Sequence, residues 1–120
     1  MILIVGGAYQ GKQAFARSLT TPEHLLLNLH EKIRERLSKG EERERIEKEI
    51  FAMIGEDSVI TADEIGCGVV PMEAFDREYR EVTGRILSRV AAKADKVYRV
   101  FAGIPTCIKS SQDEFSVSGR

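Results

Sequence analysis

The sequence predicts an α/β fold, a three-layer sandwich with a mostly parallel sheet of about four strands and a C-terminal hairpin. Short apolar runs rich in β-branched residues alternate with longer segments in which apolar residues recur at every third or fourth position. These are the patterns of buried strands and of amphipathic helices. No internal repeat or linker divides the 120 residues. Strands that alternate with helices in this way form parallel sheets through right-handed crossovers.

The strands are predicted from continuous apolar runs. Ile2–Val5 ends at a glycine and has the character of a central parallel strand that is buried on both faces. Three further runs have the length of a strand and are bounded by turn residues. The expected strands are residues 2–5, 25–27, 58–62 and 97–102. After Gly103-Ile104-Pro105, residues 106–109 are expected to return as a short antiparallel strand.

The helices are predicted from apolar residues at spacings of three and four. The clearest stripe consists of Phe75, Tyr79, Val82, Ile86 and Val90. Gly84 interrupts this helix and should cost about 1 kcal/mol relative to alanine, so it marks close packing, the approach of a ligand, or a tolerated accident. The expected helices are residues 11–19, 29–37, 41–54 and 73–94.

Composition and charge narrow the class of protein. The chain is 42% hydrophobic and 31% charged, with a net charge of −1, which is ordinary for a globular domain and gives no reason to expect a nucleic-acid partner. No apolar segment has the length of a membrane span. Cys67 and Cys107 form no metal-binding pattern. We therefore expect a cytoplasmic protein with one domain at residues 1–109 and a flexible polar tail at residues 110–120.

A glycine-rich motif follows the first predicted strand directly. Residues 6–12 have the Gly-x4-Gly-Lys spacing of a phosphate-binding P-loop, in which backbone N–H groups surround an anion at a helix N-terminus and Lys12 neutralises the β- and γ-phosphates. The next position, where Ser or Thr normally ligates Mg²⁺, holds Gln13. The residues predicted to bind GTP or ATP are Gly6, Gly7, Ala8, Tyr9, Gln10, Gly11, Lys12 and Gln13.

Two acidic residues, Asp63 and Glu64, follow the strand predicted at residues 58–62. The carboxyl ends of parallel strands border the ligand crevice of an α/β sheet, and a P-loop enzyme needs a carboxylate there to hold its metal. We therefore predict that Asp63 and Glu64 bind Mg²⁺ and act in catalysis with Lys12, while the alternative that they merely begin a loop stays open. His24 and His30 have no partner for a triad, so ordinary surface or half-buried histidines are favoured.

Two segments resemble the adenosylcobinamide kinase / adenosylcobinamide-phosphate guanylyltransferase family. Residues 2–12 resemble the family's opening, and residues 60–71 resemble its strand, acidic residue and Gly-x-Gly-hydrophobic-Val-Pro loop. The resemblance implies a P-loop fold and a kinase, a transferase of cobalamin biosynthesis that phosphorylates the aminopropanol hydroxyl of adenosylcobinamide with a nucleoside triphosphate. It also implies a homo-oligomer, commonly a trimer, and a corrinoid substrate bordered by Gly66, Gly68 and Pro71.

The chain departs from the family at several positions. The segment that carries the family's guanylylated histidine is shortened, and neither His24 nor His30 matches its motif. Asn28 stands where the family has an acidic residue at the end of its second conserved strand. We therefore expect that guanylyltransferase activity is lost. Two alternatives to a kinase stay open: a catalytically degenerate nucleotide-binding or regulatory protein of the same fold, and a structural subunit with an exposed apolar surface on the helix at residues 75–90.

Overall fold

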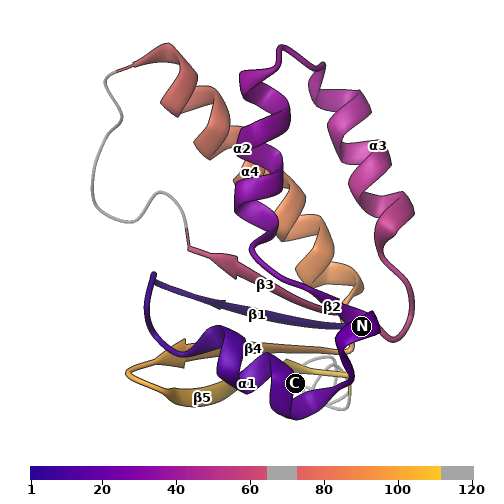
Figure 1. Cartoon of the computed structure of the whole chain (residues 1–120), viewed down its shortest axis with the longest axis vertical. Helices are drawn as coiled ribbons and strands as arrows, with labels where there is room; N and C mark the ends of the chain where they lie inside the picture. Colours follow the sequence, from indigo (N-terminus) through magenta and orange to yellow (C-terminus); the bar gives the residue numbers. More distant parts are fainter. Residues whose placement is uncertain (65–72, 112–120) are drawn as a thin grey trace, which may run out of the picture.

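The computed structural model of the chain, described for residues 1–64 and 73–111, is a three-layer α/β sandwich built on one five-stranded sheet (Figure 1). The elements are β1 (Ile2–Gly6), α1 (Lys12–Leu19), a 3₁₀ helix (Pro22–His24), β2 (Leu25–Leu26), α2 (Leu29–Ser38), α3 (Arg43–Met53), β3 (Val59–Asp63), α4 (Ala74–Lys93), β4 (Lys96–Phe101) and β5 (Ile104–Ser110). The predicted fold class is confirmed, and the predicted strands and helices lie within a few residues of their expected bounds.

The order of the strands brings predicted site residues together at the carboxyl ends of two adjacent strands. The order is β2-β3-β1-β4-β5, with the first four strands parallel and β5 antiparallel to β4. In the register between β1 and β3, Gly6 pairs with Asp63. Gly6, at the start of the glycine-rich loop, and Asp63, the first predicted acidic residue, are therefore neighbours on adjacent strands, although they are far apart in the sequence.

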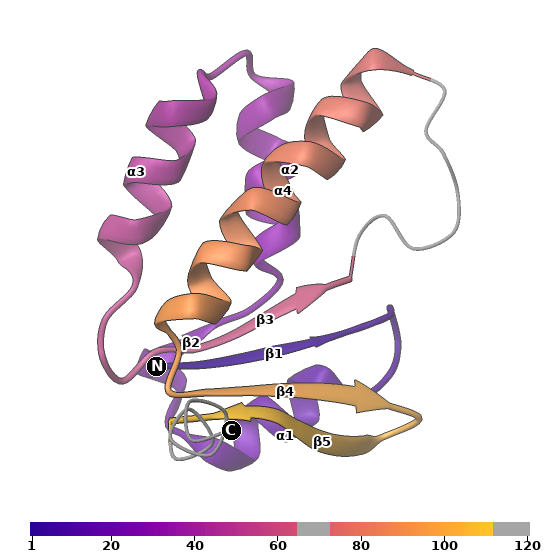
Figure 2. The same cartoon turned by 180° about the vertical axis from the view of Figure 1, so that it is seen from behind.

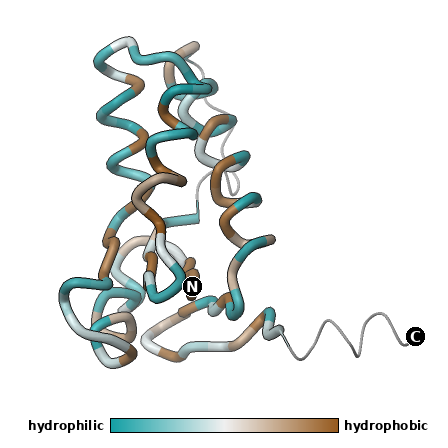
Figure 3. Tube along the Cα trace, turned by 90° about the vertical axis from the view of Figure 1, so that its right-hand side faces the viewer, coloured by the Kyte–Doolittle hydropathy of each residue, from teal (hydrophilic) through white to brown (hydrophobic). Residues whose placement is uncertain are grey.

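The helices cover the two faces of the sheet unequally. Helix α1 lies alone on one face, and α2, α3 and α4 lie together on the other, as the two opposite views show (Figures 1 and 2). The larger core lies between the sheet and the three helices, where Val82, Ile86 and Val90 of the predicted stripe are buried. A smaller core under α1 contains Ile4 and Val100. Apolar and polar stretches alternate along the helices, as expected for segments with one buried face (Figure 3).

The C-terminal hairpin differs from the prediction. β5 begins at Ile104 rather than at residue 106, and the turn consists of Ala102 and Gly103, with φ angles of 50° and 77°. Two successive residues with positive φ match the twist of a two-residue hairpin, which explains the tighter turn. Pro105 is tolerated because β5 is an edge strand. β5 also extends to Ser110, one residue into the expected tail, and the part of that tail at residues 112–120 lies outside the described residues.

Gly84 is exposed on α4, and a Cβ atom added there would meet no heavy atom within 4 Å. Close packing around this glycine is therefore excluded among the described residues. In the same part of the chain, no helix is long and apolar enough to cross a membrane.

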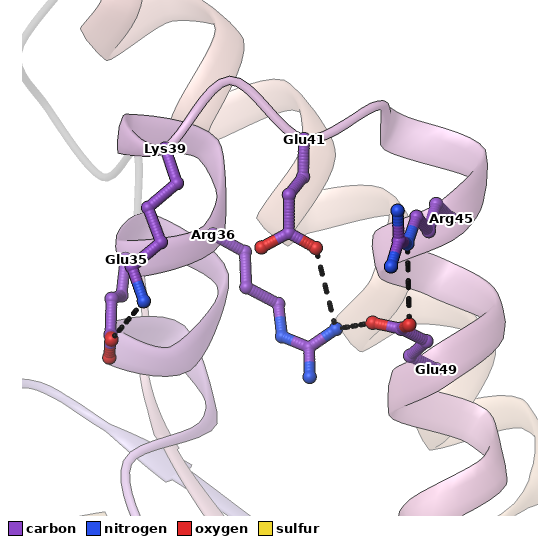
Figure 4. A network of polar contacts seen from close by, with 6 residues as sticks. All are labelled: Glu35, Arg36, Lys39, Glu41, Arg45 and Glu49. Atoms are coloured by element: carbon purple, nitrogen blue, oxygen red, sulfur yellow. Dashed lines mark hydrogen bonds and ion pairs between the residues drawn. The ribbon is translucent and has the colours of Figure 1, made fainter.

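Ion pairs connect α2 to α3 on the outside of the helical layer (Figure 4). Arg36 contacts Glu49 and lies 3.8 Å from a carboxylate oxygen of Glu41, while Arg45 lies 3.3 Å from the other oxygen of Glu49. A separate i,i+4 pair joins Lys39 to Glu35 at 3.0 Å. Surface ion pairs contribute about 0–1 kcal/mol each, so this partly exposed network adds only modestly to the packing of α2 on α3.

Candidate phosphate-binding site

The loop between β1 and α1 leaves the start of a helix open toward solvent. Helix α1 begins at Lys12, and no side chain caps its N-terminus because the N-cap residue is Gly11. The first turn contains no acidic side chain. The first N–H groups of a helix have no partner inside the helix, and together with the helix dipole they favour an anion. The loop therefore has the geometry of a phosphate-binding site.

Two glycines of the loop are required by close contacts with the hairpin. A Cβ atom on Gly6 would lie 2.5 Å from the carbonyl oxygen of Val100, and one on Gly11 would lie 3.3 Å from the Cα atom of Gly103. Gly11 also has a φ of 93°, which side chains rarely allow. In this chain both glycines are therefore needed for packing as well as for the approach of a phosphate, because the loop lies directly against β4 and the turn that follows it.

Lys12 lies inside the curve of the loop. Its Nζ atom donates to the carbonyl oxygen of Gly7 at 2.6 Å and forms an ion pair with Oδ1 of Asp63 at 2.7 Å. The side chain is 5% exposed, so the charge is buried and paired rather than free in solvent. The structure therefore brings together Lys12 and Asp63, two of the three residues predicted to act in catalysis.

His30 lies beside Asp63 together with Lys12, although the sequence favoured an ordinary surface or half-buried histidine. The ring is buried in the first turn of α2, its Nδ1 atom accepts a hydrogen bond from the backbone N–H of Asp63 at 3.0 Å, and its Nε2 atom lies 3.4 Å from Oδ2 of Asp63. Burial lowers the pKa of His30, and this effect outweighs the opposite influence of the Asp63 carboxylate. The ring is therefore neutral at pH 7, and its hydrogen is on Nε2 because Nδ1 is an acceptor.

A cavity of 390 Å³ opens between the loop and the ends of β2 and β3. Its size is at the lower end of the range of about 300–1,000 Å³ found for small-molecule pockets, so it suits a phosphate chain and a reacting hydroxyl rather than a whole corrinoid. Asn28, the N-cap residue before α2, has a φ of 58° and contributes to the wall of the cavity. The lining residues are Ala8, Tyr9, Gln10, Gly11, Lys12, Gln13, Ala14, Asn28, His30, Glu31 and Asp63.

Glu64, the third predicted catalytic residue, is oriented differently from Asp63. Its backbone N–H donates to the carbonyl oxygen of Gly6 at 2.8 Å, while its carboxylate accepts a hydrogen bond from Arg99 at 2.8 Å. Glu64 is not among the residues that line the cavity. The predicted corrinoid-contacting residues Gly66, Gly68 and Pro71 lie outside the described residues.

The described residues provide few protein ligands for a metal. Within residues 1–64 and 73–111, no three His, Cys, Asp or Glu side chains converge in a way that could hold an ion. Mg²⁺ at a nucleotide site commonly uses one or two carboxylates together with phosphate oxygens and water. Asp63 could supply the one carboxylate that such an ion needs, and the side-chain amide of Gln13 lies on the same cavity wall. The carboxylate of Glu64 is directed to Arg99 instead.

Comparison with known proteins agrees with the resemblance seen in the sequence. Residues 23–108 match the family described as cobinamide kinase / cobinamide phosphate guanyltransferase. The chain is 41% identical over 51 residues to the bifunctional adenosylcobalamin biosynthesis protein CobU of Salmonella typhimurium (strain LT2) and 37% identical over 51 residues to the protein of the same name from Escherichia coli (strain K12). Each match covers 42% of this chain and 28% of the relative. Because the family match spans more than half of the sequence, the chain belongs to the cobinamide kinase / cobinamide phosphate guanyltransferase family.

Proposed function

We propose that the chain binds a nucleoside triphosphate, GTP or ATP, on residues 6–13 and transfers its γ-phosphoryl group to the aminopropanol hydroxyl of adenosylcobinamide. One observation carries this proposal: Lys12 and Asp63 face each other at 2.7 Å in a cavity at the ends of two adjacent parallel strands. Membership of the family supports the substrate and a place in adenosylcobalamin biosynthesis. The residues matched to each curated relative span 28% of its length, so the activity is proposed for this chain rather than carried over.

The phosphates would be held by the backbone of the loop and by Lys12. The uncapped N–H groups at the start of α1 would donate to phosphate oxygens, and the ammonium group of Lys12 would leave the carbonyl of Gly7 to neutralise the charge on the transferred group. Phosphoryl transfer depends mainly on positioning and electrostatic stabilisation, and this loop supplies both. Mg²⁺ that arrives with the nucleotide would find Asp63 and Gln13 on the cavity wall and would add further charge neutralisation.

Asp63 is the acidic residue best placed to accept the proton of the acceptor. The hydroxyl oxygen of the substrate would form a bond to the γ-phosphorus as the bond from that phosphorus to the bridging oxygen breaks, and the hydroxyl proton would pass to the carboxylate of Asp63. Glu64 is less suited because its carboxylate is paired with Arg99. The cavity admits a hydroxyl on a flexible arm, and the corrin ring would remain outside it. By family resemblance, Gly66, Gly68 and Pro71 are the residues proposed to contact the corrinoid.

We further propose that guanylyl transfer is lost, because the chain departs from the family in the segment that carries the guanylylated histidine, and that the protein is cytoplasmic. A homo-oligomer is proposed as well, because the family resemblance implies one. Transfer of a guanylyl group needs a histidine with a free nitrogen lone pair directed at the nucleotide. In His30 the Nδ1 lone pair is occupied by the backbone N–H of Asp63, and Nε2 carries the hydrogen. This arrangement supports phosphoryl transfer without a covalent histidine intermediate.

The experiment is a titration of the protein with GTP and with ATP, each with and without Mg²⁺, followed by thermal stability. A ligand that binds the native state raises the midpoint, so a shift in wild type that is lost in Lys12→Ala supports the site. Lys48→Ala on the exposed surface of α3 is the matched control and should behave as wild type. Transfer of ³²P from the γ-position to cobinamide then tests the reaction. Failure of both nucleotides to shift the midpoint would overturn the proposal.

A second candidate is a nucleotide-binding protein of the same fold without catalysis. Three observations favour it: Gln13 replaces the metal-ligating hydroxyl, Asn28 has no charge, and the carboxylate of Glu64 is engaged by Arg99. This candidate predicts a thermal shift with GTP or ATP and no transfer of ³²P to cobinamide. Transfer that disappears in Lys12→Ala would exclude it.

A further inference from the structure

We propose that His30 is a positioning residue, which holds Asp63 in place through its backbone when the phosphates of a nucleotide draw Lys12 away from the Asp63 carboxylate. This inference rests on the proposed function, because it concerns the same cavity and the same phosphoryl transfer. It goes beyond that function by assigning a role to a side chain that the proposed reaction leaves unused and that the sequence favoured as an ordinary histidine.

Among the described residues, Lys12 and His30 contact Asp63 through different atoms. Lys12 contacts Oδ1 at 2.7 Å. His30 lies 3.4 Å from Oδ2 through Nε2, and its Nδ1 atom also accepts the backbone N–H of Asp63 at 3.0 Å. The ring is therefore hydrogen-bonded to the main chain of Asp63 and lies beside its carboxylate, so it fixes the place at which the Asp63 side chain leaves β3.

The contact with Lys12 is the one that a nucleotide would remove. The ammonium group has two acceptors in the free protein, the carbonyl of Gly7 and the carboxylate of Asp63. Phosphate oxygens at the start of α1 would compete for that group with a larger negative charge. Once Lys12 turns to the phosphates, Oδ1 of Asp63 loses the ammonium group that holds it in the free protein, so the position of Asp63 then depends on its other contacts.

The contact with His30 depends on elements outside the glycine-rich loop. The backbone N–H of Asn28, just before α2, donates to Oγ1 of Thr61 on β3 at 2.9 Å. Leu29 is fully buried in the larger core between α2 and the sheet. The start of α2 is therefore fixed to β3 two residues before Asp63. The distance from His30 to Asp63 is set by this pairing, so rearrangement of the loop around a phosphate leaves it unchanged.

The hydrogen bonds also restrict what the ring itself can do. Because Nδ1 accepts a hydrogen, the neutral ring presents a donor at Nε2. A donor there stabilises a carboxylate and cannot attack phosphorus. Oxygen Oε1 of Glu31 lies 4.0 Å from Nε2 and is the other acidic group beside the ring, but it is too distant for a hydrogen bond. Nε2 therefore places a donor 3.4 Å from the Asp63 carboxylate and leaves no lone pair there for a nucleophile.

The kinetic test uses three variants. His30→Phe keeps the bulk of the ring and removes both contacts, His30→Asn restores an acceptor for the N–H of Asp63, and His24→Phe is the matched control in the 3₁₀ helix, outside the cavity lining. We expect His30→Phe to lower kcat for phosphoryl transfer to cobinamide by about 100-fold and to leave KM for GTP within about threefold of wild type. His30→Asn should recover part of the loss, and His24→Phe should match wild type. Equal effects on kcat and KM, or no recovery in His30→Asn, would overturn the inference.

A double-variant cycle separates positioning from general destabilisation. If His30 acts through Asp63, His30→Phe should cause no further loss of kcat in a protein that already carries Asp63→Asn. A loss that is fully additive would mean that His30 acts by another route, and the inference would fall.

A readout without turnover keeps the inference separate from the proposed function. In protein with ¹⁵N-labelled histidine and backbone, the coupling across the hydrogen bond from the Asp63 amide to Nδ1 of His30 is followed by NMR as GTP is added. We expect this coupling to persist at saturating GTP. Its disappearance with GTP bound would overturn the role of His30 and leave the nucleotide site intact, whereas absence of GTP binding would overturn both proposals.

Discussion

The side-chain oxygen of Gln10 accepts a hydrogen bond from the backbone N–H of Ala102 at 2.6 Å. The carbonyl oxygen of the same residue accepts a second one from Gly103 at 2.9 Å. One residue of the glycine-rich loop is therefore bonded to both residues of the β4–β5 turn. The hairpin therefore gives the loop a fixed support at Gln10.

Replacement of Gln10 by leucine should weaken both the fold and the candidate phosphate site. Leucine has a similar size but cannot accept the hydrogen bond from Ala102, so we expect a loss of about 1 kcal/mol in the free energy of unfolding. Nucleotide affinity should fall with it, because the loop loses part of its support. Urea unfolding and the thermal shift with GTP measure the two effects. Gln13→Leu is the comparison, because Gln13 lines the same cavity, whereas the hydrogen bonds to the turn come from Gln10. An equal loss of stability in both variants would contradict the role of Gln10.

Replacement of Gly84 by alanine should stabilise the protein by about 1 kcal/mol. The residue is exposed inside α4, and its added methyl group would contact nothing within 4 Å. The gain comes from the lower conformational freedom of alanine in the unfolded chain. Gly6→Ala provides the contrast, because its Cβ atom would lie 2.5 Å from the carbonyl oxygen of Val100 and must destabilise the fold. Urea unfolding of the two variants should give changes of opposite sign.

The sequence predicts those features that depend on short stretches of the chain. The continuous apolar run at Ile2–Val5, the helical stripe on α4 and the Gly-x4-Gly-Lys spacing of residues 6–12 are each complete within a short stretch. Local patterns of this kind determine both the element and the face that it buries. The fold class and the candidate phosphate loop could therefore be expected before the structure was known.

The rest of the site depends on contacts between distant segments. His30 meets the backbone of Asp63 across 33 positions of the sequence, and Glu64 meets Arg99 across 35. Both contacts follow from the registers of β3 with β2 and of β1 with its neighbours, which no local pattern specifies. One feature of the sequence could have drawn attention to His30: it follows shortly after the end of β2, and the carboxyl ends of parallel strands border the ligand crevice. That position predicts proximity to a ligand, but it gives no information on which atom of the ring accepts a hydrogen bond.

Two buried threonines should respond in opposite ways to the same substitution. Thr83 and Thr61 are both fully buried, but Oγ1 of Thr83 has no hydrogen-bond partner among residues 1–64 and 73–111, whereas Oγ1 of Thr61 accepts the backbone N–H of Asn28 at 2.9 Å. An unsatisfied buried hydroxyl costs about 1–3 kcal/mol, so Thr83→Val should raise the free energy of unfolding. Thr61→Val should lower it, since it leaves the N–H of Asn28 unpaired beside the candidate site. Chemical denaturation measures both, and a loss of stability in Thr83→Val would show that its hydroxyl has a partner in solution.

The stability of the fold should fall as the pH drops below the ordinary pKa of histidine, and His30 should account for part of that fall. Burial, together with the charge of Lys12, lowers the pKa of His30 in the folded chain despite the carboxylates of Asp63 and Glu31. The unfolded chain therefore binds the proton more readily than the folded one, and stability rises with pH until the unfolded imidazole is neutral. The contribution of His30 is fully present above about pH 7 and decreases below about pH 6.5, with a slope of at most about 1.4 kcal/mol per pH unit. Urea unfolding between pH 7.5 and 5 measures it, and the slope should be smaller in His30→Phe than in wild type. A slope that is identical in His30→Phe and wild type would mean that the folded chain accepts a proton on His30 as easily as the unfolded chain does.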